Sequence, residues 1–332
     1  MVTYVKVKKE DAQKVRKKLL DFNPDYPVKS DKTSVYFPVK NKSPNTVTLQ
    51  AKKRTKKPTS VKQALAGALT EKEHDNLVKG FDIVGSIAII EISSSLEKKK
   101  KLIGKAVMDV HKNVKTVFKK KSGRQGIYRI VPLELIAGKE NYETLYTEHG
   151  VRMKFDVSKV YFSPRLSEER RRITSLVKEG EVVAGLFAGV GPFPLVIAKA
   201  KKCTVYSVEL NPVAVDYMRR NIGMNQKNLK GSVIPVEGDV RKVVNTLPKC
   251  DRVIMPLPKG GADFLDSALV VCKPGGTIHF YQFAEDQDLY SDALKKIVKA
   301  GKRAKRKIKV LNKKVVRPYA PRKSQVVIDF RA

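Results

Sequence analysis

The stretch Ala184-Gly-Leu-Phe-Ala-Gly-Val-Gly-Pro-Phe-Pro194 decides the fold of this chain. Residues 182–186 are mostly apolar and predict a short buried strand. Gly189-Val-Gly191 then predicts a turn in which the missing Cβ atoms let a ligand approach backbone N–H groups. Pro192 is typical of the first turn of a helix. A strand, a glycine turn and a helix N-terminus in this order predict a nucleotide-binding crevice.

The third position of the glycine pattern limits the class of nucleotide that the turn is expected to bind. The dinucleotide fingerprint G-x-G-x-x-G would place its last glycine at position 194, where this chain has Pro194. The mismatch disfavours NAD and FAD and leaves other nucleoside ligands open.

Two acidic residues follow strand-like segments beyond this turn. Glu209 stands 18 residues after Gly191, where a carboxylate accepts hydrogen bonds from ribose hydroxyls. The alternative is an acid that merely flanks a helix. Asp239 ends the next strand-like segment and is placed to accept from an exocyclic amine of a purine, with Val240 packing on the ring.

The chain beyond Gly180 alternates regularly between strand-like and helix-like segments. The expected strands cover residues 182–186, 204–208, 233–236, 253–255 and 277–281. This succession predicts a doubly wound, mostly parallel sheet. Two later segments, 308–311 and 325–330, are expected to close one sheet edge in antiparallel orientation.

The charge balance indicates a polyanionic partner. The 332 residues include 68 Lys and Arg against 33 Asp and Glu, a formal net charge of +35. Nucleic acid is the favoured partner of so basic a chain. The alternatives are a salt-rich cell interior or a lysine-rich thermophile surface, although thermophile enrichment normally raises Glu together with Lys.

Composition also disfavours several classes of protein. The three cysteines, Cys203, Cys250 and Cys272, are too scattered for a disulfide framework or a CxxC metal site. The four histidines show no ligand spacing, so we expect no metal. We expect a cytoplasmic protein, because no apolar run has the length of a membrane span and the first residues lack the apolar core of a signal peptide.

The first 60 residues predict a small α/β module. The expected elements are a strand at 2–7, a helix at 10–20 and a strand at 34–39. A basic run at 52–57 follows, and both a solvated linker and an RNA-contacting edge fit it.

A second domain is expected from Phe81 onward. Residues 82–92 predict one near-continuous buried strand. In residues 98–124, 11 of 27 positions are Lys or Arg, and valines at 107, 110, 114 and 117 recur at helical spacing. We therefore expect phosphate contacts here, from Lys98, Lys99, Lys100 and Lys101. Residues 299–317 hold ten Lys or Arg and no acid, which makes a second candidate surface.

Taken together, the glycine turn, Glu209, Asp239 and Pro274-Gly-Gly276 resemble class I methyltransferases that bind S-adenosylmethionine. The resemblance becomes narrower in four motifs. The segments 161–170, 185–193, 255–259 and 319–322 look like the archaeal and eukaryotic tRNA (guanine-37-N1) methyltransferases.

This resemblance implies the site residues and their roles. Glu169 takes the place of the general base that removes the N1 proton of guanine, and Arg129 that of the arginine facing O6. Tyr161 matches a residue near the substrate base. If 164–178 is helical, Arg165 lies one turn before Glu169 and is placed to orient it; a routine surface ion pair is the alternative. The expected cofactor site comprises Phe187, Gly189, Gly191, Glu209, Asp239, Val240 and Pro258.

Three positions depart from the family pattern. The family usually has an acid where this chain has Gly185, an Asn where it has Pro256, and often a second Arg where it has Val131. The departures leave alternatives open. One is a wyosine-pathway enzyme of the same fold, either a methyltransferase acting on the tricyclic 4-demethylwyosine base or an aminocarboxypropyl transferase. The other is an RNA-binding relative without activity.

The expected architecture is a doubly wound, Rossmann-like class I methyltransferase domain at 166–332. Two smaller α+β RNA-binding domains are expected to precede it, at 1–65 and 80–165. The expected partner is tRNA with guanosine at position 37. We expect the protein to be a monomer and not to bind a membrane.

Overall fold

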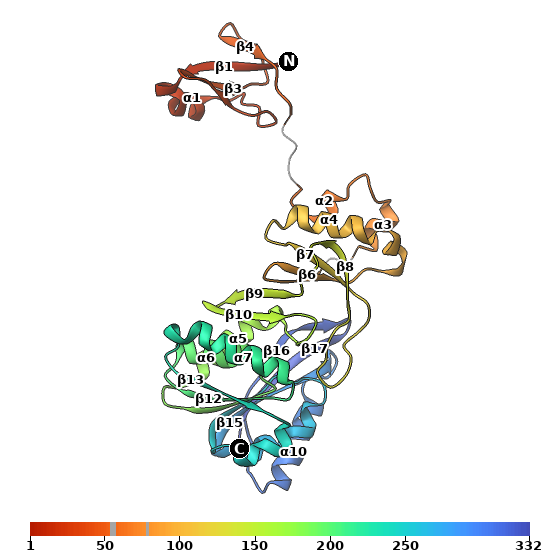
Figure 1. The fold of residues 1–332 in the computed structure, drawn as a ribbon, viewed down its shortest axis with the longest axis vertical. Helices are drawn as coiled ribbons and strands as arrows, with labels where there is room; N and C mark the ends of the chain where they lie inside the picture. Colours follow the sequence, from red (N-terminus) through yellow and green to blue (C-terminus); the bar gives the residue numbers. More distant parts are fainter. Residues whose placement is uncertain (54–57, 78–79) are drawn as a thin grey trace. The chain divides into compact units, whose positions relative to one another are not determined.

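The computed structural model describes residues 1–53, 58–77 and 80–332, which form two compact units, Met1–Ala64 and Leu65–Ala332 (Figure 1). The larger unit contains the predicted nucleotide-binding crevice. Most of the basic run at 52–57 lies outside the described residues.

The first unit is a four-stranded antiparallel sheet in the order β2-β3-β1-β4, with short helical segments. Its elements are β1 (Val2–Lys8), η1 (Lys9–Asp11), α1 (Ala12–Lys18), β2 (Lys29–Ser30), β3 (Ser34–Pro38), β4 (Thr46–Leu49) and α2 (Val61–Ala64). Alternate residues of β1 point into the core, where Tyr4 and Phe37 are buried. Both predicted strands are present as β1 and β3, whereas the helix ends two residues earlier than expected, at Lys18.

The core of the second unit is a seven-stranded sheet in the order β13-β12-β11-β14-β15-β17-β16. The strands are β11 (Val182–Leu186), β12 (Thr204–Glu209), β13 (Ser232–Glu237), β14 (Cys250–Met255), β15 (Cys272–Glu285), β16 (Lys309–Ala320) and β17 (Lys323–Arg331). The first five are parallel, and β17 and β16 close one edge antiparallel. The predicted doubly wound sheet with its antiparallel closure is therefore confirmed.

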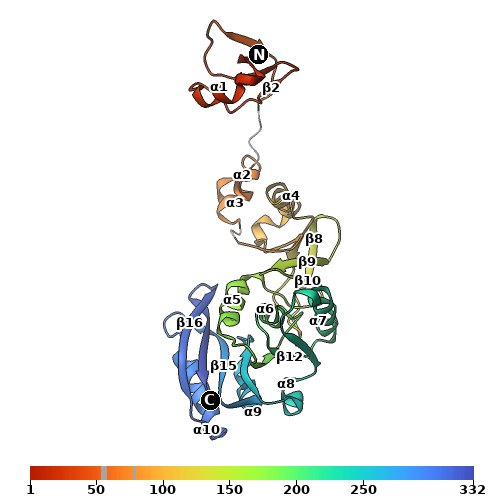
Figure 2. The same ribbon diagram turned by 90° about the vertical axis from the view of Figure 1, so that its left-hand side faces the viewer.

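Helices cover both faces of this sheet (Figures 1 and 2). One face is packed by α5 (Ser167–Leu176), α6 (Pro192–Ala200) and α7 (Pro212–Asn225), and the other by α8 (Val240–Val243), α9 (Leu265–Val271) and α10 (Ser291–Arg303). Successive side chains of β15 pack against the helices on opposite faces of the sheet. Tyr281 packs with α5 and α6, and Phe280 packs with α9 and α10. Within the described ranges, no helix has both the length and the apolar character needed to cross a bilayer.

A second, four-stranded sheet in the order β5-β6-β7-β8 belongs to the same unit. Its strands are β5 (Asp82–Val84), β6 (Ile87–Ile90), β7 (Thr116–Lys120) and β8 (Leu133–Gly138), and the nearby helices are α3 (Glu71–Asp75), η2 (Ser94–Lys99) and α4 (Lys100–Val110). The prediction of one continuous strand over 82–92 is wrong. Gly85, at a φ of +59°, turns the chain into a hairpin, and a Cβ there would lie 2.3 Å from the Leu145 carbonyl oxygen.

The helical reading of the four valines is correct only for the first two. Val107 and Val110 belong to α4, whereas Val114 lies in the following loop and Val117 in β7. All four are apolar, but the helix ends at Val110, and Val114 enters the core from a turn and Val117 from a strand. The spacing alone does not reveal this end, because a strand also places alternate side chains on one face.

A two-stranded hairpin of β9 (Glu143–Glu148) and β10 (Val151–Asp156) was not predicted. The free edge of β10 is satisfied by α7, because Asn221 Oδ1 accepts from the Lys154 N–H at 2.7 Å and Asn225 Oδ1 accepts from the Arg152 N–H at 2.9 Å. Both asparagines are buried. Side-chain amides thus satisfy backbone N–H groups that a third strand would otherwise pair with.

Arg170 fixes this hairpin to α5. Its guanidinium donates to both carboxylate oxygens of Glu148, and the two side chains are only 2% and 3% exposed. Removing one partner of such a pair leaves an uncompensated buried charge, so Arg170→Ala should lower the free energy of unfolding by about 3–5 kcal/mol. Urea denaturation measures this loss. Arg171→Ala is the matched control, since Arg171 is exposed, and a loss of similar size there would contradict the buried-pair explanation.

Candidate active site

The glycine turn follows the carboxyl end of β11 as predicted. Gly189 has a φ of +57° and Gly191 a φ of +90°, and Gly191 directly precedes Pro192 at the start of α6. A Cβ on Gly191 would lie 2.9 Å from Met218 Cγ, so both the backbone conformation and the space require glycine. Phe187 also has a positive φ, +58°, which is a strained conformation for an aromatic residue.

Glu209 ends β12 and ties the next loop to this turn. One carboxylate oxygen accepts from the Gly189 N–H and the other from the Asn211 N–H, each at 2.8 Å. Burial raises the pKa of Glu209, while these backbone hydrogen bonds oppose the shift. A carboxylate has about four acceptor sites, so each oxygen keeps one for a ligand hydroxyl. This geometry suits a ribose diol.

Asp239 caps α8 and is bound by a neighbouring arginine. Its Oδ1 accepts from the Arg241 N–H at 2.9 Å, and its Oδ2 pairs with the guanidinium at 2.6 Å. The hydrogen bond from Arg241 is the main reason why the pKa of Asp239 is lowered. Val240 is buried beside it. The carboxylate is ionised, and because the Arg241 side chain also donates to Oδ1 at 3.1 Å, one acceptor site remains on Oδ2.

Aromatic side chains add an apolar wall at the same sheet edge. Phe187 and Phe264 meet edge to face, with ring centroids 4.9 Å apart. The Arg241 guanidinium lies 5.1 Å from the centroid of Phe264. This wall joins the strained residue of the glycine turn to the loop that carries Asp239.

Glu169, on the first turn of α5, is buried at 4% exposure and holds three hydrogen bonds. Oε1 accepts from the Tyr281 hydroxyl at 2.5 Å and from Arg172 at 2.8 Å, and Oε2 accepts from Arg172 at 2.8 Å. Burial and the Glu169 charge hold the pKa of Tyr281 well above its usual range, so this hydroxyl is a donor. Oε2 keeps one free acceptor site.

Arg172 continues this network across the sheet. Its guanidinium also donates to Asp329 of β17, at 2.7 and 3.2 Å. Burial lowers the pKa of Arg172, but the hydrogen bonds that it donates to two carboxylates outweigh this effect and the net shift is upward. Asp329 also accepts from His279 at 2.6 Å, and burial keeps His279 neutral by lowering its pKa. Since Arg252 can only donate, its 2.8 Å contact makes the other His279 nitrogen the acceptor.

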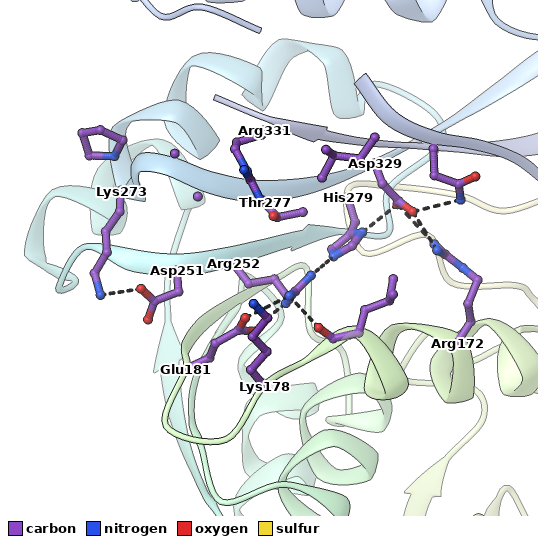
Figure 3. Close-up of a pocket in the computed structure, with 16 residues that line it drawn as sticks. Arg172, Lys178, Glu181, Asp251, Arg252, Lys273, Thr277, His279, Asp329 and Arg331 are labelled. Carbon is purple, nitrogen blue, oxygen red and sulfur yellow. Dashed lines mark hydrogen bonds and ion pairs between the residues drawn. The ribbon is translucent and has the colours of Figure 1, made fainter. Parts of the chain in front are cut away.

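A cavity of about 520 Å³ opens beside this network, and Figure 3 shows Arg172, Arg252, His279 and Asp329 along one wall. Its other lining residues include Glu181, just before β11, and Asp251, at the start of β14. The cavity therefore lies at the amino ends of the parallel strands, whereas the glycine turn follows their carboxyl ends. It is not the nucleotide-binding crevice.

Comparison with known proteins identifies the family. A model described as the TRM5/TYW2 methyltransferase domain matches residues 144–311, and models of the tRNA methyltransferase 5 and TYW2 N-terminal domains match 5–47 and 61–141. The tRNA (guanine(37)-N(1))-methyltransferase Trm5b of Pyrococcus abyssi is 39% identical over 100% of this chain and 99% of its own length. The chain belongs to the TRM5/TYW2 family.

Other family members extend the comparison. The solved complex of aTrm5 with tRNALeu has a TM-score of 0.85 and 33% identity, covering 100% of this chain and 99% of its own. Taw22 of Nanoarchaeum equitans, named a tRNA (guanine(37)-N(1))/4-demethylwyosine(37)-methyltransferase, is 33% identical over 75% of this chain and 98% of its own. TYW2 of Methanocaldococcus jannaschii, solved with AdoMet, is 27% identical at a TM-score of 0.57, covering 76% and 98%. The predicted family, fold class and enzyme class, a tRNA methyltransferase, are confirmed.

The structure places Arg129 and Tyr161 of this TRM5/TYW2 protein near each other. Arg129 lies in the loop between β7 and β8 at a φ of +57°, and burial is the main cause of its lowered pKa. Tyr161 is beneath Arg124, whose guanidinium lies 4.6 Å from the ring centroid. The Tyr161 carbonyl oxygen would be 3.6 Å from a Cβ on Gly189, so this tyrosine adjoins the glycine turn.

The predicted pairing of Arg165 with Glu169 is wrong. Arg165 lies in a short 3-10 turn before α5 and donates to Asp82 at 2.6 Å, whereas Arg172 holds Glu169. The 3-10 geometry advances by three residues per turn, so the one-turn spacing does not bring these two side chains together.

Two of the four predicted phosphate-binding lysines form ion pairs within the protein, and the other two do not. Lys99 pairs with Glu73 at 2.7 Å, and Lys100 pairs with Glu97 at 2.7 Å and Glu134 at 2.6 Å. Lys98 and Lys101 are exposed and form no ion pair with a described carboxylate.

Two of the three unusual positions, Gly185 and Pro256, lie at the carboxyl ends of β11 and β14. A Cβ on Gly185 would make ordinary contact with Pro194 Cγ at 3.5 Å, so packing alone does not require glycine there. Pro256 follows β14 and leads into a turn in which the Leu257 N–H donates to the Met255 carbonyl at 2.8 Å. Pro258 accepts from the Phe283 N–H at 3.4 Å. Nothing in the structure explains the change to Val131.

Sequence reasoning missed Arg172, Tyr281, Phe264 and Arg241. Arg172 is one of three consecutive arginines and no local pattern marks it, since its partner Asp329 is 157 positions away. Among the residues that the structure describes, no cluster of His, Cys, Asp and Glu could hold a metal ion.

Proposed function

We propose that this protein transfers the methyl group of S-adenosylmethionine to N1 of guanosine 37 in tRNA. The observation that carries the proposal is the full-length relation to an enzyme named for that reaction, together with the glycine turn bound to Glu209. S-adenosylmethionine supplies an electrophilic methyl group when bound. The chain's residues must therefore hold it, place guanine beside it and remove the N1 proton.

The carboxyl edge of the sheet fits this cofactor. Glu209 offers one free acceptor on each oxygen to the ribose hydroxyls, and Gly189 and Gly191 leave room for close approach. Asp239 accepts from the adenine amine while Val240 and the Phe187–Phe264 pair supply apolar contact.

Glu169 and Arg129 supply the acid–base chemistry. The N1 proton of guanine passes to the free acceptor site of Glu169 Oε2, and the N1 electron pair forms the new bond to the methyl carbon as the carbon–sulfur bond breaks. Arg129, which no described carboxylate neutralises, stabilises the negative charge that develops on O6. Arg172 and Tyr281 orient the Glu169 carboxylate.

The remaining proposals concern the partner and the cellular context. Residues 1–65 and 80–165 contact the tRNA, and 166–332 carry out catalysis on a monomer. Three buried free cysteines fit a reducing cytoplasm.

A second activity, methylation of the 4-demethylwyosine base at the same position, is favoured by one observation. Taw22, whose name includes both substrates, is similar to three quarters of this chain. Both reactions use the same cofactor site, so only the substrate separates them.

Nucleoside analysis of methylated tRNA tests both activities. With S-adenosylmethionine carrying a labelled methyl group, a transcript with guanosine at position 37 should yield labelled 1-methylguanosine, and the adenosine-37 transcript should yield none. Equal labelling of the two transcripts would refute the guanine-37 proposal. A tRNA carrying 4-demethylwyosine then tests the second activity alone.

Lys98 and Lys101 are the lysines of this group that remain free to bind phosphate. The double variant Lys98→Ala/Lys101→Ala should weaken tRNA binding about 10-fold and reduce the slope of log affinity against log salt by about 1–2. Lys99→Ala/Lys100→Ala removes the same charge but releases internal acids, and is expected to alter thermal stability as well. An unchanged salt slope in the first variant would place the phosphate contacts elsewhere, as in 299–317.

A further inference from the structure

Three arginines from two segments lie near Tyr161, and a fourth, Arg165, lies near one of them, Arg317. Arg124 and Arg129 come from the loop between β7 and β8, Arg165 from the turn before α5, and Arg317 from β16. Arg124 lies over the ring of Tyr161 at 4.6 Å, and both Arg129 and Arg317 lie within electrostatic range of that tyrosine and of Arg124. Because Tyr161 adjoins Gly189, this arginine cluster borders the glycine turn.

The arginine cluster is not neutralised from within. Asp82 faces it and is held by Arg165 at 2.6 Å. No described carboxylate forms an ion pair with Arg124, Arg129 or Arg317. Half-buried cations without counter-charges are costly, and burial together with neighbouring arginines lowers the pKa of both Arg129 and Arg317. Such an arrangement is stabilised when an anion binds.

Arg317 is positioned by its strand and keeps most of its donors. Its Nε donates to Gln325 of β17 at 3.0 Å, which fixes the plane of the guanidinium. The two terminal nitrogens retain four N–H groups, enough for bidentate contact with a phosphate. Position 317 is one of only two half-buried residues in the otherwise exposed strand β16.

An exposed aromatic platform adjoins Arg317. Tyr319 stacks on Phe283 with ring centroids 3.8 Å apart and remains 44% exposed. The Arg317 guanidinium lies 5.9 Å from the Tyr319 ring centroid. Cations beside an exposed ring are the usual elements of single-stranded nucleic-acid binding, in which a base stacks on the ring while the backbone meets the charges.

We propose that Arg124 and Arg317 bind the RNA phosphates that flank the methylated nucleotide, and that Tyr319 stacks on a neighbouring unpaired base. The proposal rests on the proposed function, because that function places the target base beside Arg129 and Tyr161. It assigns to β16, the last strand in the sheet order, a direct part in holding the RNA. Arg124 and Arg317 are positioning residues in this assignment, and the methyl transfer itself needs neither.

Binding and turnover measurements on the full-length protein separate this role from catalysis. Arg317→Ala and Arg124→Ala should each weaken tRNA binding about 10-fold and raise KM for tRNA to match, with kcat at saturating tRNA changed less than about 2-fold. Because the contacted loop is single-stranded, each variant should reduce the salt slope by about 0.7. Arg317→Lys keeps the positive charge but loses the planar guanidinium that can bind a phosphate with two N–H groups. Its tRNA affinity should therefore lie between those of Arg317→Ala and the parent protein. Tyr319→Phe should bind as the parent does, and Tyr319→Ala should bind more weakly.

Arg331→Ala is the matched control, since Arg331 is an exposed arginine of β17 at the opposite end of the strand from Gln325. It should leave tRNA affinity and salt slope unchanged. Equal weakening by Arg331→Ala would mean that only net charge matters and would overturn the proposal. An unchanged affinity and slope in both Arg124→Ala and Arg317→Ala would also overturn it, as would a collapse of kcat with an unchanged dissociation constant.

The test keeps the two proposals apart. Dissociation constants need no methylation, so a parent protein that binds tRNA but forms no 1-methylguanosine would contradict the proposed function and leave the arginine cluster testable. Competition distinguishes the partner's class: a single-stranded oligonucleotide should displace tRNA from the parent protein, and polyglutamate of equal charge should not. Equal displacement by polyglutamate would assign the arginine cluster to an acidic protein instead.

Discussion

Glu209→Gln should weaken S-adenosylmethionine binding by about 100-fold. Both carboxylate oxygens already accept backbone N–H groups, from Gly189 and Asn211. A glutamine amide must therefore turn its NH2 group toward one of these donors, whichever way it is oriented. The variant also loses the negative charge that accepts from the ribose hydroxyls, and hydrogen bonds to charged groups contribute about 1.5–3 kcal/mol each. Titration calorimetry with the cofactor measures the change directly.

Glu237→Gln provides the control for this prediction. Glu237 is the register partner of Glu209 on β13, ends the neighbouring strand and is 48% exposed, 4.0 Å from Arg219. The Glu237→Gln variant removes the same charge from the same sheet edge. It should leave the dissociation constant for S-adenosylmethionine within about 2-fold of the parent value. Similar affinities for the two variants would show that Glu209 does not contact the cofactor.

Glu169→Gln should reduce kcat for methyl transfer by about 100-fold to 10,000-fold, the usual contribution of a general base. The amide oxygen can replace only one of the two accepting oxygens, so the NH2 group must face Arg172 or Tyr281, and the basic acceptor site is lost. Arg172 keeps Asp329 as a second partner, so the fold should persist. Single-turnover kinetics at saturating tRNA and cofactor isolate the chemical step, and the dissociation constants of both ligands should stay within about 2-fold.

Glu168→Gln is matched to this change. Glu168 precedes Glu169 on α5, is 75% exposed and pairs with Arg171 at 2.5 Å. Its variant should keep the full rate. If Glu169→Gln retained more than about a tenth of the parent rate, Glu169 would be a structural acceptor for Arg172 and not the base.

The sheet of the second unit could be predicted because its signals are local. The buried parallel strand β11 and the second half of β14 are apolar runs, and glycines mark the turn at 189–191. Gly85 was misread because its turn is imposed by close packing against Leu145, 60 residues away in sequence. The β9–β10 hairpin was missed because α7 asparagines complete it, and asparagines in a helix carry no strand signal.

The same distinction between local signals and long-range contacts applies to the site. The position of Glu209 beside the glycine turn could be predicted because strand, turn and spacing lie within 30 residues of one another. The partner of Glu169 could not, since Arg172 is singled out from its neighbours Arg170 and Arg171 only by the arrival of Asp329 from β17. Arg165 was wrongly assigned because sequence does not distinguish a 3-10 turn from the first turn of an α-helix.

The position of β16 at the sheet edge has a consequence for colloidal behaviour. One side of this twelve-residue strand pairs with β17, and the other presents backbone groups that have no strand partner in the described chain. A flat apolar edge of this length would recruit the same edge of another molecule, but Lys309, Lys313 and Lys314 place like charges along it. The lysines along β16 therefore also repel a second copy of the protein.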